Sequence, residues 1–128
     1  MKKILIASAA AGALFFSTAA FADLAGELTT AQTHAGLAAK AGDINMVHMH
    51  LHHALNCLVG PGGAGFDTGN ANPCASAGKG ILVDSTDAAQ KTKLQAAVAD
   101  ANKGIAATDL AAAQAAANDT ATAIGGAK

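Results

Sequence analysis

The chain has 128 residues, of which 52% are hydrophobic, 13% are charged and only 3% are aromatic. Its eight basic residues are all lysines and are opposed by nine acidic residues, so the formal net charge at pH 7 is −1. A nucleic-acid-binding protein presents a basic face that neutralises phosphates, and the absence of any cationic excess excludes that class.

Residues 1–22 have the three parts of a secretory signal peptide. Two lysines give the start a positive charge, residues 4–16 are an apolar stretch of 13 residues, and residues 20–22 read Ala-Phe-Ala, an A-x-A cleavage site. The apolar stretch is shorter than the ~20 residues of a membrane-spanning helix. We therefore predict cleavage after Ala22, a periplasmic or secreted protein with no membrane contact, and a single domain over residues 23–128.

The predicted exported chain is acidic and poor in large side chains. Six lysines remain against nine acidic residues, which gives a net charge of −3, and Phe66 is the only aromatic residue. Most of its apolar residues are alanines, which suit closely packed helices better than a wide ligand pocket.

Two helices are predicted in the first half by apolar residues at three- and four-residue spacing. They cover about residues 24–41 and 44–59, and are joined through Gly42, a helix stop, and Asp43, an N-cap. So short a connection folds the second helix back beside the first as a helical hairpin.

The second half predicts another hairpin. Its first helix starts near Ser85 or Thr86, and its second follows a break around residues 104–108. The predicted fold is all-α: an up-down-up-down four-helix bundle of two helical hairpins. A disordered, alanine-rich chain is the alternative.

Residues 60–83 predict a long loop without regular structure, because they hold seven glycines and two prolines. The two cysteines, Cys57 and Cys74, favour a disulfide in an oxidising compartment. This bridge would tie the far half of the loop to the end of the second helix. A loop of this length is functional or anchored, so residues 60–80 are also a candidate surface for a protein partner.

The second helix carries a cluster of histidines and methionines over residues 46–53. At 100° per residue, one row contains Met46, His50 and His53, and the other contains His48 and His52, with Met49 between them. Two histidines at i and i+4 can share a metal ion. Counted from the turn, His34 of the first helix stands at a similar height and is a further candidate ligand. The predicted metal ligands are His34, Met46, His48, Met49, His50, His52 and His53.

These ligand types indicate a transition metal. Neutral imidazole suits Cu(II), Ni(II) and Zn(II), and thioether sulfur suits Cu(I), so the mixture favours copper. A polar, partly exposed face that happens to be rich in histidine is the simpler alternative, and a b-type haem held between His and Met side chains is another. No arrangement of nucleophile and base or of paired carboxylates predicts an enzyme.

The export signal, the helical hairpins and the His-Ala pairs (Thr33-His34-Ala35 and His52-His53-Ala54) resemble those of small periplasmic, His-rich four-helix-bundle metal-binding proteins. The resemblance covers the two hairpins and not the loop. It implies a metal buffer or carrier. Those proteins have histidines along all their helices, whereas the last two predicted helices here have none, so at most one or two sites are expected. The competing hypothesis is a structural or interaction protein that uses its disulfide-anchored loop.

Overall fold

The computed structural model describes residues 22–128, so the predicted signal peptide, apart from Ala22, lies outside the described residues. Within this part, the chain is helical and contains no strand, which confirms the all-α prediction. The helices are α1 (Leu24–Lys40), α2 (Ile44–Val59), α3 (Ile81–Asp84), α4 (Ala88–Ala106) and α5 (Leu110–Gly125). No helix of these residues is long and apolar enough to cross a membrane.

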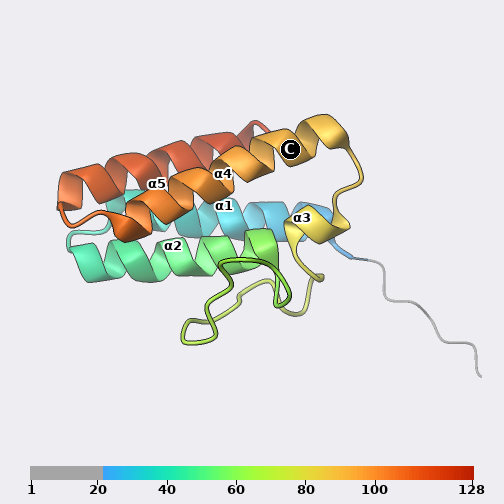
Figure 1. The fold of residues 1–128 in the computed structure, drawn as a ribbon, viewed down its shortest axis with the longest axis horizontal. Helices are drawn as coiled ribbons and strands as arrows, with labels where there is room; N and C mark the ends of the chain where they lie inside the picture. The colour runs from blue at the N-terminus through green and yellow to red at the C-terminus, as the bar shows by residue number, and fades with distance from the viewer. Residues whose placement is uncertain (1–21) are drawn as a thin grey trace, which may run out of the picture.

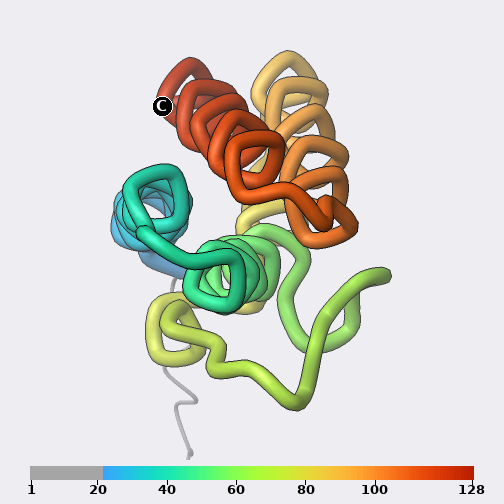
Figure 2. Tube along the Cα trace, turned by 90° about the vertical axis from the view of Figure 1, so that its left-hand side faces the viewer, coloured from blue at the N-terminus to red at the C-terminus, as the bar shows by residue number. Residues whose placement is uncertain are grey.

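The four long helices pack side by side (Figures 1 and 2). Helix α1 contacts α2 and α5, and α4 contacts α5 and α2. Each long helix begins at an aspartate whose carboxylate accepts a hydrogen bond from a backbone N–H of the first turn, which satisfies a donor that the helix itself leaves free. The capping residues are Asp23, Asp43, Asp87 and Asp109.

Small side chains form most of the core between these helices. Nine alanines of the long helices have at most 2% of their surface exposed, and the leucines at 51, 55, 58 and 94 fill the space between them. Gly104 marks the closest approach of α4: an added Cβ would lie 2.5 Å from Leu51 Cδ1 and 3.2 Å from Ala116 Cβ.

Three details of the predicted elements are wrong. Helix α4 begins at Ala88 rather than near Ser85 or Thr86, because Asp87 is the cap and the Ser85 hydroxyl instead donates to the Gln90 side chain. The predicted loop of residues 60–83 ends in the single helical turn α3, whose Ile81 is fully buried.

The third error concerns the break predicted around residues 104–108. Helix α4 continues through Gly104 to Ala106, because the glycine fits the tight contact with α2 and α5 and does not end the helix.

The long loop leaves α2 and returns to it, and lies on the side of α2 that faces away from α4 and α5 (Figures 1 and 2). Gly60 and Gly80 touch where its two ends cross: both have positive φ, and a Cβ added to Gly80 would lie 2.7 Å from Gly60 Cα. The Cys57–Cys74 disulfide is present, as predicted, and closes the loop against α2.

Candidate metal centre

Three histidines from the first hairpin form a cluster. His34 comes from α1 and His50 and His53 from α2, and one ring nitrogen of each lies within 4.8 Å of the others. The rings of His34 and His53 meet edge to face with centroids 5.0 Å apart, and those of His50 and His53 do so at 5.8 Å. The short turn after Lys40 sets this register, because it fixes which residues of α1 and α2 face each other.

The closest pair already has the spacing of two ligands on one ion. His34 Nδ1 and His50 Nδ1 are 3.2 Å apart. Two nitrogens bound tetrahedrally to a metal at about 2.0 Å each are about 3.3 Å apart. His53 has a ring nitrogen within 4.8 Å of a ring nitrogen of each of the other two, so this third ring has to come closer to complete a three-nitrogen site. At this distance one of the two Nδ1 atoms donates a hydrogen bond to the other.

The cluster favours neutral imidazoles. All three histidines are half-buried. Burial lowers the pKa of His34, and repulsion from the protonated forms of His53 and His50 lowers it further. Burial likewise lowers the pKa of His53, with a further contribution from His50 and His52. Because only the neutral ring binds a metal ion, these shifts keep the nitrogens available at neutral pH.

His53 also has an unsatisfied polar atom. Its Nδ1 is buried and has no hydrogen-bond partner. A buried polar nitrogen without a partner is unfavourable, and a bound metal ion, or a shift of the ring towards His34 and His50, would satisfy it.

The other predicted ligands lie elsewhere. His48 Nε2 donates to the carbonyl of Ala107, the C-cap of α4, at 3.0 Å. His52 Nδ1 lies 3.2 Å from Asp67 Oδ2 in the long loop, close enough for a charge interaction although the pair lacks the alignment of a hydrogen bond. His48 and His52, the predicted i, i+4 pair, thus contact two separate partners and do not belong to the cluster. Met46 is 41% exposed, one turn before His50, and Met49 is half-buried.

Two fully buried polar residues, Asn56 and Glu27, were not predicted from the sequence. Asn56 is fully buried, and its Nδ2 donates to the carbonyls of Asp67, Asn70 and Ala71 at 2.9–3.2 Å, while its Oδ1 accepts from Asp67 N at 2.8 Å. Glu27 is fully buried in α1, although its position on the core stripe, four residues before Ala31, could have signalled this.

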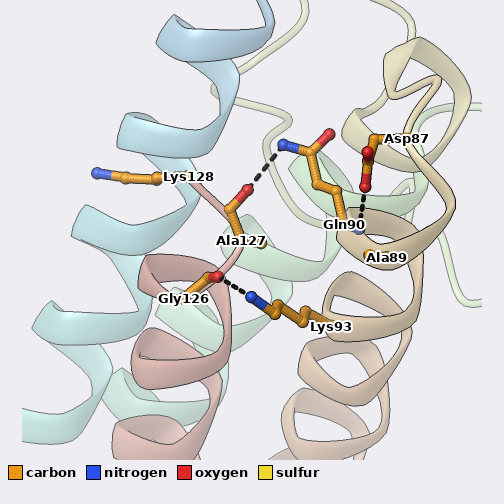
Figure 3. A pocket seen from close by; sticks show the side chains of 7 residues that line it. All are labelled: Asp87, Ala89, Gln90, Lys93, Gly126, Ala127 and Lys128. Carbon is orange, nitrogen blue, oxygen red and sulfur yellow. Dashed lines mark hydrogen bonds between the residues drawn. The ribbon is translucent and has the colours of Figure 1, made fainter.

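A surface pocket lies between the start of α4 and the C-terminal segment (Figure 3). It surrounds the C-terminal segment, where Lys93 Nζ donates to Gly126 O and Gln90 Nε2 donates to Ala127 O, each at 2.7 Å. These bonds anchor the chain end on α4, and none of the three clustered histidines lines this pocket.

No protein-family model matches the chain, and neither a curated protein nor a solved structure shows significant similarity to it.

Proposed function

We propose that this protein is an exported transition-metal-binding protein, with copper as the favoured ion, built as an up-down-up-down bundle. The observation that supports the proposal is the convergence of His34, His50 and His53, whose ring nitrogens lie within 4.8 Å of one another. No carboxylate belongs to the group. Three neutral nitrogens favour Cu(II) over Ni(II) and Zn(II) on the Irving–Williams order.

The same geometry favours a buffer or carrier. Three protein ligands leave a fourth position for water or for a ligand of a partner protein. A half-buried site with an open position exchanges its ion more readily than a closed structural site does. Met46, one turn before His50 and exposed, is a candidate additional ligand for Cu(I), which prefers thioether sulfur.

The test is calorimetric titration of the tag-free exported protein with Cu(II), Ni(II) and Zn(II). We expect one ion per chain and the tightest binding for Cu(II). His34→Gln, His50→Gln and His53→Gln should each weaken binding by more than about tenfold, since even an outer partner of a metal ligand contributes that much.

His48→Gln is the matched control, because its side chain retains a donor for the Ala107 carbonyl and lies outside the cluster. It should leave the affinity unchanged. Thermal unfolding of every variant separates loss of ligand from loss of fold. The proposal is refuted if no ion binds saturably below roughly 10 µM, a weak affinity for any specific site, or if His48→Gln weakens binding as much as His50→Gln.

A further inference from the structure

A second group of titratable side chains lies where α1 begins and α3 ends. Glu27 Oε1 accepts a hydrogen bond from Gly80 N at 3.2 Å, and Asp84 Oδ2 accepts one from Lys79 N at 2.7 Å. A Cβ added to Gly78 would overlap both carboxyl groups, so the two acids flank this glycine from different elements.

Within residues 22–128, no cationic side chain pairs closely with either acid, although Lys79 lines the same pocket as Asp84. Glu27 is fully buried, and its Oε2 has no hydrogen-bond partner. In residues 22–128, the one close contact between a cationic side chain and a carboxylate is that of His52 with Asp67. Burial raises the pKa of Glu27 to about 7, and the bond from Gly80 opposes this. Repulsion from Asp84, a hydrogen bond that the protonated Glu27 shares with Asp84, and repulsion from Asp23 raise the pKa further. Without a cation nearby, the ionised form of a buried acid is unfavourable, so such an acid holds its proton to a higher pH.

The start of the predicted exported chain is fixed beside the pair. Asp23 N donates to Ala77 O at 2.8 Å, directly before Gly78, and the Asp23 side chain caps α1 by accepting from Gly26 N at 2.9 Å. Ala22 lines the same pocket as Asp84. Removal of Ala22 would therefore leave the nitrogen of Asp23 as a free amine bonded to Ala77, which lines this pocket together with Asp84.

We propose that the α-ammonium group of Asp23, created by cleavage of the signal peptide, is the counter-charge of Glu27 and Asp84. A signal peptidase hydrolyses the Ala22–Asp23 bond: water supplies the hydroxyl of the departing Ala22 carboxyl group and a proton to the Asp23 amine. The amine then binds a further proton at neutral pH, where an α-amino group has a pKa of ~7.7–8.0. One of its three N–H groups retains the bond to Ala77, and the others are free to face the pocket.

The proposal makes cleavage part of folding. In the precursor, the nitrogen of Asp23 is a neutral amide with one hydrogen, so the buried pair lacks its cation. The precursor is therefore less stable than the exported chain, and its full stability is reached only after the signal peptide has been removed.

The experiment compares two exported proteins purified after cleavage of the full chain. One has the natural sequence, and the other has Ala-Gly inserted between Ala22 and Asp23, so that its ammonium group lies two residues away. Mass spectrometry confirms each N-terminus. We expect the insertion to lower the folding equilibrium constant, measured by urea unfolding at pH 7, by about three- to tenfold, which lies between the effects of breaking an exposed and a buried ion pair.

The effect should depend on the acidic pair. With Asp84→Asn and Glu27→Gln together, the insertion should change the folding constant by less than about twofold, since the charges that it separates are gone. Asp119→Asn, at an exposed acid of α5, and Lys79→Gln should preserve the full effect. If the insertion still lowers the folding constant in the double variant, its effect is steric and the proposal is overturned. The proposal is also overturned if the effect of the insertion disappears with Lys79→Gln.

A second measurement does not need the inserted residues. In the natural exported chain, the pKa of the Asp23 amine, followed by NMR, should be above the ordinary ~8 and should fall towards it with Asp84→Asn. An amine that titrates normally in both proteins, or an N-terminus other than Asp23, would contradict the proposal.

Discussion

Replacement of Asn56 by alanine should detach the long loop from α2. The buried amide makes four hydrogen bonds to the loop backbone, three through Nδ2 and one through Oδ1. Nδ2 has only two hydrogens for its three acceptors, so the three contacts together are equivalent to about two full bonds. Each bond contributes about 0.5–1.5 kcal/mol, and unsatisfied groups add to the loss. We expect Asn56→Ala to lower the free energy of unfolding by about 2–4 kcal/mol.

Urea unfolding measures this loss, and amide hydrogen exchange should show lost protection at Asp67 N, whose acceptor is the Asn56 side chain. Asn102→Ala is the matched control, since this exposed asparagine bonds only to Val98 O within its own helix. It should change the stability by less than about 0.5 kcal/mol. Asn56→Asp should be worse than alanine above pH 5, because a carboxylate oxygen would face three carbonyl oxygens. Equal stability of the two Asn56 variants would refute this reasoning.

Three further predictions concern stability. Gly104→Ala should destabilise the protein by about 1–2 kcal/mol in urea unfolding because its methyl group meets a leucine of α2 at 2.5 Å, whereas Gly36→Ala, with nothing within 4 Å, should stabilise α1 by about 0.5–1 kcal/mol. The opposite order would contradict the packing. Reduction of the disulfide, which closes a separation of 17 residues, should cost about 3 kcal/mol and lower the melting temperature. In the chain with the Ala-Gly insertion, the free energy of unfolding should fall by about 2 kcal/mol between pH 4.5 and pH 7. The raised pKa of Glu27 means that the folded state binds this proton more tightly than the unfolded state does, and the stability that the proton contributes is lost as the pH rises. Glu27→Gln should remove this slope, and a slope that persists would place its origin elsewhere.

The helices and the hairpin register were predictable because they depend on local signals. Apolar periodicity located the core stripe of α2, and a tight turn after α1 is enough to bring His34 opposite His50. The disulfide followed from there being only two cysteines in a chain that is predicted to be exported. Each of these inferences uses residues that are close in sequence or have no alternative partner.

The division of the histidines was not predictable, because it depends on distant segments. His48 bonds to Ala107, 59 residues away, and His52 lies against Asp67 in an irregular loop. Helical geometry alone predicts that His48 and His52 bind one metal ion together, because they are four residues apart. The burial and bonding of Asn56 were not predictable for the same reason, because its acceptors are backbone carbonyls whose positions are set by the folded loop.

The candidate metal centre and the main anchors of the loop use different side chains of α2, and the contact of the histidine segment with the loop, that of His52 with Asp67, does not involve a clustered histidine. The clustered histidines are held by the α1–α2 hairpin. The turn of this hairpin and the Asp43 cap of α2 are formed without residues 60–80. His48 fixes the same helix to the end of α4, while Asn56 and Cys57 hold the loop at its other end. A variant that frees the loop should therefore retain metal affinity, and one that removes a clustered histidine should leave the loop in place. If α2 acts as such a common support, metal binding and partner binding can be lost independently of each other.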